Sequence, residues 1–115
     1  MDAKWTTKSD FQRSISQGVT LIDFDAPWCQ PCREQAPIIA TLERDFKGTA
    51  QIKTVNIDDH QEIALNLGIQ SIPTIIIYKN GQEIDRFVGL QSTETLDGAL
   101  RTALDAAAMG AMGPH

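Results

Sequence analysis

Hydrophobic and polar positions alternate in patterns that divide the chain into strands and helices. Apolar runs at 19–24 (VTLIDF) and 74–79 (TIIIYK) are typical of strands that are covered on both faces. A third strand is predicted at 51–58 (QIKTVNID). A fourth, EIDRFV at 83–88, follows an Asn-Gly pair that tolerates the positive φ of a hairpin turn, so the last two strands are expected to be antiparallel.

Apolar residues at helical spacing separate and follow these strands. A short helix is predicted to carry Phe11 and Ile15 on one face. The other three predicted helices run from the cysteines to Phe46, over 60–68 and over 92–108. Pro37, inside the second helix, removes one backbone hydrogen bond, so a kink is expected there. Because a helix connects the first two strands, these strands are expected to be parallel. The order of all the elements predicts an α/β fold with a mixed sheet and helices on both faces.

Composition limits the classes of partner. The chain has 115 residues, of which 42% are hydrophobic and 22% charged, and these values fit one globular domain. We expect that domain over residues 1–107, with a flexible tail over 108–115. The formal charge is −5. Because an acidic chain gains nothing from counterion release, neither a nucleic acid nor an anionic membrane surface is expected as a partner.

The sequence also predicts a cellular compartment. No apolar run approaches the ~20 residues that span a bilayer, and the first residues, MDAKWTTKSDF, lack the apolar core of a signal peptide. The expected location is therefore the cytoplasm. Cys29 and Cys32 are the only cysteines. In a reducing cytosol such a close pair is more often catalytic or metal-binding than structural.

Cys29 and Cys32 lie at the junction between the first predicted strand and the long helix. Their spacing places both sulfurs on one side of the first helical turn, where they can form a disulfide. If Cys29 is the N-cap, Pro31 has no N–H to offer, so the amide of Cys32 is the expected donor to the Cys29 sulfur. That donor and the positive helix end lower the pKa of Cys29 from its reference value of ~8.5. Cys29 is therefore predicted to attack, and Cys32, deeper in the helix and less exposed, to resolve the mixed disulfide.

Two other interpretations of the cysteine pair remain open on the residues alone. A structural zinc site needs four ligands, whereas the pair supplies two and only His60 and His115 remain as further soft ligands. Free cysteines are also often buried without a chemical role. The setting Trp-Cys-Gln-Pro-Cys at a strand–helix junction favours a redox pair over both, and no metal site is expected.

The motif WCQPC (28–32) resembles the active site of the thioredoxin family. The resemblance covers most of the chain and includes LIDF (21–24), Pro37, NID (56–58), SIPT (71–74), KNG (79–81) and VGL (88–90). It implies the thioredoxin fold, with a central mixed sheet of about five strands flanked by about four helices. It also implies reversible dithiol–disulfide exchange with disulfide-containing protein substrates. A thioredoxin reductase that uses FAD and NADPH is the implied source of electrons.

The resemblance implies a substrate groove beside the cysteines. Pro73 is implied to be cis and to face them, although a proline at the start of a strand is also structurally harmless. Ser71 and Ile72 are implied to hold a substrate strand with their backbone groups. Gly89 matches a glycine that leaves room for the substrate, and it equally fits a strand end with positive φ. Trp28 is implied to shape the surface next to the nucleophile. It also fits a partly buried packing residue, and the two interpretations are compatible.

Two aspartates precede the cysteines. Asp23 and Asp25 lie two residues apart on a strand, so their side chains point to the same face. A buried carboxylate within an apolar strand is costly. The resemblance implies that Asp23 manages a proton for Cys32, which a raised pKa would permit near neutral pH. It implies no role for Asp25.

Three positions depart from the family pattern. Gln30 replaces a glycine between the cysteines, Asp25 replaces an aromatic residue, and Thr54 stands where many members have a lysine that can pair with the buried aspartate. We expect Gln30, Pro31 and Asp25 to tune the redox potential. For Asp25 the hypothesis is that its charge disfavours thiolate formation and makes the couple more reducing.

The sequence therefore predicts a monomeric thiol–disulfide oxidoreductase that carries electrons on its own cysteines, without a bound cofactor. The alternative is a specialised thioredoxin-like reductase or disulfide isomerase that serves one dedicated partner. A binding module without redox turnover is disfavoured because both cysteines are present.

Overall fold

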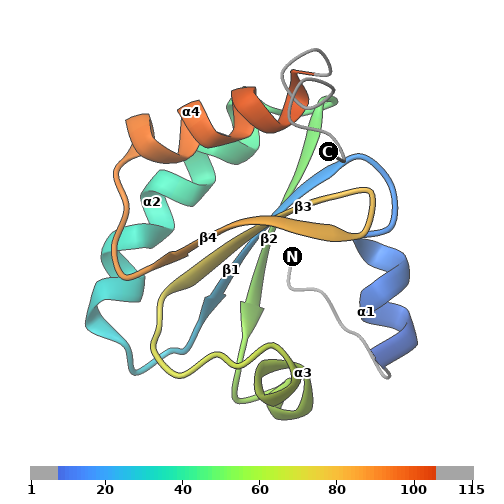
Figure 1. The fold of residues 1–115 in the computed structure, drawn as a ribbon. Coiled ribbons are helices and arrows are strands. Elements are labelled where there is room, and N and C mark those ends of the chain that lie inside the picture. Colours follow the sequence, from blue (N-terminus) through green and yellow to red (C-terminus); the bar gives the residue numbers. More distant parts are fainter. Residues whose placement is uncertain (1–7, 106–115) are drawn as a thin grey trace.

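The computed structural model describes residues 8–105, and this part of the chain contains four helices and four strands (Figure 1). In chain order these are α1 (Lys8–Ser14), β1 (Val19–Asp25), α2 (Gln30–Asp45), β2 (Ala50–Asn56), α3 (Gln61–Asn66), β3 (Thr74–Lys79), β4 (Gln82–Val88) and α4 (Thr93–Leu104). Each strand and helix predicted from the hydrophobic pattern is present, and the strand predicted at 74–79 has the predicted bounds.

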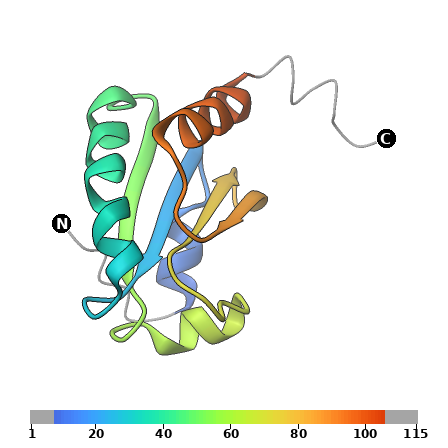
Figure 2. The ribbon, with the colours of Figure 1, turned by 90° about the vertical axis from the view of Figure 1, so that its left-hand side faces the viewer.

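The strands form one mixed sheet in the order β2-β1-β3-β4. β1 pairs in parallel with β2 and antiparallel with β3, and β3 pairs antiparallel with β4. The predicted parallel pair and hairpin are therefore confirmed. α2 and α4 lie on one side of the sheet and α1 and α3 on the other, and Figures 1 and 2 show these layers from two directions.

The hairpin between β3 and β4 has the backbone that its sequence predicted. Asn80 has a φ of 51° and Gly81 a φ of 87°, the left-handed conformations that an Asn-Gly turn requires. The turn is also joined to the segment before β1, because the Gly18 amide donates to Oδ1 of Asn80 at 2.8 Å. This contact holds the β3–β4 hairpin against the start of the central strand.

The structure corrects several expectations. The sheet within residues 8–105 has four strands rather than about five, because only these four have an apolar strand pattern and the further strand rested on the family resemblance alone. Ile15 lies just after α1 rather than on it, and β2 ends at Asn56, where the chain turns. α2 continues through Pro37, and the kink there stays a prediction. The tail over 108–115 lies outside the described residues.

Two clusters of buried side chains fill the space on either side of the sheet. The cluster under α2 and α4 consists of Val19, Leu21, Ile39, Leu42, Phe46, Ile75, Ile77, Leu96, Leu100 and Ala103. The cluster under α1 and α3 consists of Phe11, Ile15, Ile22, Phe24, Val55, Ile63, Ile76 and Tyr78. Neighbouring residues of β1 and β3 contribute to opposite clusters, as expected for strands covered on both faces.

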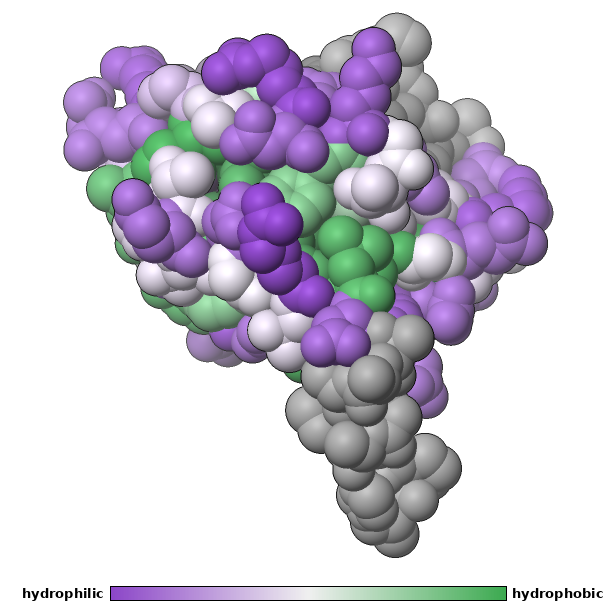
Figure 3. Space-filling view, turned by 90° about the horizontal axis from the view of Figure 1, so that it is seen from above, coloured by the Kyte–Doolittle hydropathy of each residue, from purple (hydrophilic) through white to green (hydrophobic). Residues whose placement is uncertain are grey.

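The outer surface over α4 is mostly polar. Figure 3 looks down on this end of the molecule and shows hydrophilic side chains over most of the surface, with a smaller hydrophobic patch between them. Within residues 8–105, no helix is long and apolar enough to cross a membrane.

Candidate active site

The cysteine pair lies where β1 gives way to α2, at the lower end of both elements in Figure 1. β1 ends at Asp25, a short turn follows, and Cys29 is the N-cap of α2 with extended backbone angles (φ −92°, ψ 114°). Cys29 and Cys32 form a disulfide. The N-cap position and the disulfide place both sulfurs at the positive end of the helix, where a thiolate is stabilised in the reduced protein.

A backbone hydrogen bond distinguishes the two cysteines. The amide of Cys32 donates to the sulfur of Cys29 at 3.2 Å, and Pro31, which has no N–H, precedes it in the first turn. This is the donor that the sequence predicted. The exposed fractions of the two residues, 5% for Cys29 and 3% for Cys32, differ too little to separate their roles. The hydrogen bond and the N-cap position support the prediction that Cys29 is the nucleophile.

The loop before β3 contacts the cysteines from the other side. The Ile72–Pro73 peptide bond is cis, and the carbonyl oxygen of Ile72 lies 3.7 Å from the sulfur of Cys29. Pro73 is buried, whereas Ser71 is exposed and its carbonyl accepts a hydrogen bond from the Thr74 hydroxyl at 2.6 Å. The structure thus places one of the predicted docking residues, Ile72, next to the sulfur that is predicted to attack.

Gly89 lies next to this loop at the end of β4. Its amide donates to the carbonyl of Pro73 at 2.8 Å, and its φ is 94°. This positive φ accounts for the glycine, as the strand-end interpretation expected. A Cβ built at this position would meet no atom within 4 Å, so room for a substrate at Gly89 stays a prediction. On either side of it, Val88 and Leu90 are 61% and 46% exposed.

Trp28 presents most of its side chain to solvent, with 65% of the residue exposed. Its indole Nε1 donates to Oδ2 of Asp58 at 3.1 Å. Trp28 is thus exposed rather than partly buried, and its role in shaping the surface beside Cys29 stays a prediction. Sequence reasoning did not single out Asp58, although it lies in the NID segment that carries part of the family resemblance.

Asp23 is a buried carboxyl group on the α2 side of β1. It is 1% exposed, and its Oδ1 has no hydrogen-bond partner among residues 8–105. Burial, and secondarily the negative charge of Asp25, raise the pKa of Asp23 from 3.8 to about 7. Its register neighbour on β2 is Thr54, so no cation at that position offsets the cost of ionisation. Asp23 can therefore exchange a proton near neutral pH.

The residues expected to tune the redox potential have different surroundings. Asp25 is half-buried two residues after Asp23 and acts on its pKa. Gln30 is exposed, and its Oε1 accepts from Arg33 at 3.4 Å. Arg33 also donates to the carbonyl of Pro27 at 3.1 Å. These hydrogen bonds of Arg33 connect Gln30 and Pro27 on either side of Cys29. The effect of Gln30 on the redox potential stays a prediction.

Sequence reasoning missed a buried amide on α2. Gln35 is completely buried one helical turn after Cys32, where its amide group pairs with the backbone of Gln91. A signal was available, because Gln35 falls on the buried stripe of α2 together with Cys32, Ile39 and Leu42. A polar residue on such a stripe indicates a specific hydrogen-bond partner.

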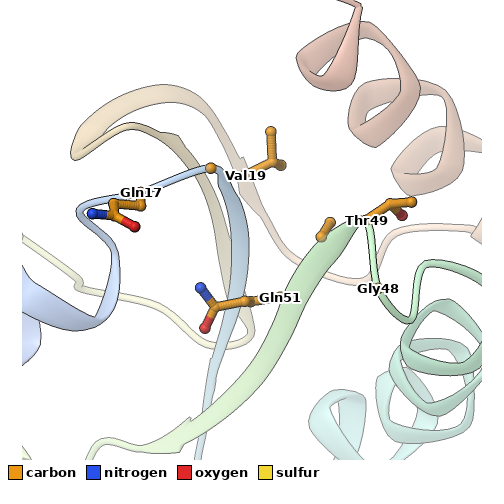
Figure 4. A pocket seen from close by; sticks show the side chains of 7 residues that line it. Gln17, Val19, Gly48, Thr49 and Gln51 are labelled. Carbon is orange, nitrogen blue, oxygen red and sulfur yellow. The ribbon is translucent and has the colours of Figure 1, made fainter.

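No metal site is evident in the part of the chain that the structure describes. Among residues 8–105, no group of three His, Cys, Asp or Glu side chains could hold a metal ion. A pocket of about 290 Å³ lies at the opposite end of the sheet from the cysteines and is lined by Gln17, Gly18, Val19, Gly48, Thr49, Ala50 and Gln51 (Figure 4). None of these side chains is ionisable, whereas an overlapping pocket of about 260 Å³ is lined in part by Glu43, Lys47 and Lys53.

Comparison with known proteins gives a consistent result. The family model described as thioredoxin matches residues 2–102. A thioredoxin of Staphylococcus aureus is 40% identical to this chain over 90 residues, which are 78% of this chain and 86% of that protein.

Solved structures show the same similarity. The thioredoxin of Malassezia sympodialis superposes with a TM-score of 0.78 at 28% identity, covering 87% of this chain and 90% of that one. A mutant thioredoxin from Halobacterium salinarum gives a TM-score of 0.77 at 25% identity, covering 86% of this chain and 87% of that one.

Proposed function

The chain belongs to the thioredoxin family and is a thiol–disulfide oxidoreductase that reduces protein disulfides. From this premise we propose that its two cysteines have different roles in the reaction. Cys29 attacks the substrate disulfide, and Cys32 resolves the mixed disulfide that results. The observation that carries this proposal is the 3.2 Å hydrogen bond from the Cys32 amide to the Cys29 sulfur. It stabilises negative charge on Cys29 rather than on Cys32.

The reaction balances without a bound cofactor. The Cys29 thiolate forms a bond to one substrate sulfur, and the substrate disulfide breaks and releases a thiolate. Cys32 then loses its proton to Asp23 and attacks Cys29, which forms the Cys29–Cys32 disulfide and releases the second substrate thiolate. Two electrons pass from the protein to the substrate. The pKa of about 7 for Asp23 supports its role as the proton acceptor.

We propose that the substrate docks along the loop that precedes β3. Ser71, Ile72 and cis-Pro73 offer backbone groups next to Cys29, as the 3.7 Å distance between the Ile72 carbonyl and the Cys29 sulfur supports. Trp28 and Gly89 border this groove. The exposed side chains of Trp28, Val88 and Leu90 supply an apolar rim for the substrate segment.

We propose that a thioredoxin reductase restores the dithiol with electrons from NADPH through FAD. Such a supply of electrons fits a reducing compartment, which supports a cytoplasmic location. In this proposal the domain spans residues 1–107 and acts as a monomer, and Gln30, Pro31 and Asp25 set its potential.

A dedicated reductase or isomerase is the second candidate function. The half-buried Asp25 beside Asp23 favours it, because this charge alters the redox site relative to the family pattern. Turnover with a general thioredoxin reductase distinguishes the two candidates. Steady reduction of several unrelated protein disulfides supports the general carrier, whereas turnover with a single partner supports the dedicated one.

The two single cysteine variants test the mechanism and serve as controls for each other. Cys29→Ser is expected to abolish insulin-disulfide reduction and to form no mixed disulfide, because the nucleophile is lost. Cys32→Ser is expected to accumulate mixed disulfides through Cys29, visible by mass spectrometry and reversed by dithiothreitol. The mechanism is wrong if either variant turns over normally, or if Cys29→Ser traps the substrate and Cys32→Ser does not.

A further inference from the structure

A completely buried glutamine joins the redox helix to the linker between β4 and α4. Gln35 is 0% exposed and lies one helical turn after Cys32 on α2. Its Nε2 donates to the carbonyl of Gln91 at 3.0 Å, and its Oε1 accepts from the amide of Gln91 at 2.8 Å. One side-chain amide thus pairs with both backbone groups of a residue that is 56 positions away in the sequence.

These two hydrogen bonds belong to a longer series that reaches the nucleophile. The side chain of Gln91 donates to the carbonyl of Gly89 at 3.2 Å. The amide of Gly89 donates to the carbonyl of Pro73 at 2.8 Å, and the carbonyl of Ile72 lies 3.7 Å from the sulfur of Cys29. The series starts on α2 and returns to the N-terminal end of α2, where the disulfide lies.

The end of β4 and the linker that follows it carry exposed apolar side chains. Val88 and Leu90, on either side of Gly89, are 61% and 46% exposed. Ser92, at the other end of the linker, is the N-cap of α4. Figure 1 shows the linker from β4 to α4 running beside the first turns of α2. Its contacts with Gln35 on α2 therefore help to hold it in this position.

An apolar residue at position 35 could not make these contacts. Leucine has nearly the volume of glutamine but offers neither a donor nor an acceptor, so the N–H and C=O of Gln91 would lose their partners. Unpaired backbone groups in a partly buried place are costly, and the linker would shift toward water to satisfy them. The two hydrogen bonds between Gln35 and the Gln91 backbone thus favour one position of the linker relative to α2.

We propose that Gln35 is a positioning residue for substrate docking, which holds the linker with Val88 and Leu90 at a fixed place relative to Cys29 and cis-Pro73. The inference rests on the proposed function, because it concerns the groove in which the substrate disulfide is reduced. Gln35 touches neither sulfur in this role. It acts through the Gln91 backbone, so its loss should weaken substrate binding more than it slows the exchange chemistry.

The experiment compares wild type with Gln35→Leu by two measurements. Amide hydrogen exchange followed by NMR reports whether the Gln91 amide is held, and its protection is expected to fall about tenfold or more when the acceptor is lost. Steady-state reduction of a protein disulfide, insulin, is expected to show a KM about tenfold higher with kcat changed less than about twofold. A merely structural role would lower the amount of folded protein without separating KM from kcat.

Leu42→Ala is the matched control. Leu42 lies on the same buried stripe, two turns farther along α2, and is 0% exposed. The variant should lose at least as much stability through its cavity, yet its KM should stay within about twofold of wild type because the Leu42 side chain cannot form hydrogen bonds to the backbone of Gln91. An equal rise in KM in both variants would overturn the positioning role.

The remaining outcomes separate this inference from the proposed function. Unchanged exchange at Gln91 in Gln35→Leu overturns the linker contact, whatever the wild type does with disulfides. Lost protection with an unchanged KM overturns the docking role while the proposed function stands. A wild type that reduces no disulfide overturns the proposed function, and the docking role with it.

Discussion

The two faces of the sheet are built from the same strands but bury different kinds of polar group. Along β1, Leu21 and Asp23 point toward α2 and α4, whereas Thr20 and Ile22 point toward α1 and α3. The α2 side buries a carboxyl group and, through Gln35 on the helix, a paired amide. On the α1 side, the buried polar groups are hydroxyls.

This difference shows where the fold accepts an energetic cost. The hydroxyls of Thr20 and Tyr78 and one oxygen of Asp23 have no hydrogen-bond partner within residues 8–105. Burying an unpaired neutral hydroxyl lowers the free energy of unfolding by a small amount, whereas burying an unpaired carboxylate lowers it much more. Only the face that carries the redox helix contains the costly group. We infer that the loss of stability caused by the buried carboxyl group is retained because this group exchanges a proton. Substitutions on the two faces of the sheet test this contrast.

The largest effect is expected for Asp23→Asn. Between pH 3.8 and about 7 the folded protein holds a proton on Asp23 that the unfolded chain releases, so stability falls as the pH rises through this window. At pH 7 and above the lost stability is on the order of 4 kcal/mol. Asn cannot ionise, so the variant should be more stable by up to this amount at pH 8 and close to wild type at pH 4. Urea unfolding across this pH range measures the difference.

Activity and a control complete the test of Asp23. Turnover of Asp23→Asn should fall at least about tenfold at pH 7, because Cys32 loses its proton acceptor. Thr20→Val removes a polar group from the opposite face of the same strand, and it should change neither the turnover nor the pH dependence of stability. If Asp23→Asn shows the wild-type pH dependence of unfolding, the carboxyl group does not titrate as described.

A smaller effect is expected for Tyr78→Phe on the α1 side. The ring packs edge-on against Phe11 with the ring centroids 5.9 Å apart, and phenylalanine keeps this contact. The variant removes a buried hydroxyl that has no partner in the described part of the chain. It should therefore be as stable as wild type or more stable by about 1 kcal/mol, with unchanged turnover. Thermal unfolding and insulin reduction measure both. A clear loss of stability would mean that the hydroxyl is paired.

The smallest effect is expected for Asp25→Asn. Its charge is the lesser cause of the raised pKa of Asp23, so the variant should lower that pKa only modestly. Removing the charge should also favour the thiolate and raise the reduction potential by roughly 10–30 mV. Redox titration against glutathione measures the potential. Glu34→Gln, an exposed change on α2, is the matched control for the loss of one charge. A potential that stays constant or moves lower contradicts the hypothesis for Asp25.

Much of the redox site follows from contacts that are close in sequence. The hydrogen bond between the Cys32 amide and the Cys29 sulfur was predicted because N-cap geometry and the missing N–H of Pro31 leave one donor. The hairpin at Asn80 was predicted for a similar reason, since few residues tolerate positive φ. Such features depend on a few neighbouring residues and on backbone sterics.

Contacts between distant residues were not predictable in the same way. The bond from Trp28 to Asp58 joins residues 30 positions apart, and the contact between Cys29 and Ile72 spans 43 positions. The resemblance to a family placed Ile72 near the cysteines, but nothing indicated Asp58 as the partner of Trp28. The partners of exposed polar groups depend on the paths of loops, and no periodicity in the sequence encodes those paths.

The sequence by itself determined the order of the elements and the N-cap at Cys29, because these depend on hydrophobic spacing and on the chemistry of adjacent residues. Only the tertiary structure decided how deeply Asp23 is buried, since its raised pKa depends on the packing of α2 against the sheet. The tertiary structure also decided that Gln35 meets the backbone of Gln91. A buried amide needs a partner, and the fold alone determines which backbone segment lies within its reach.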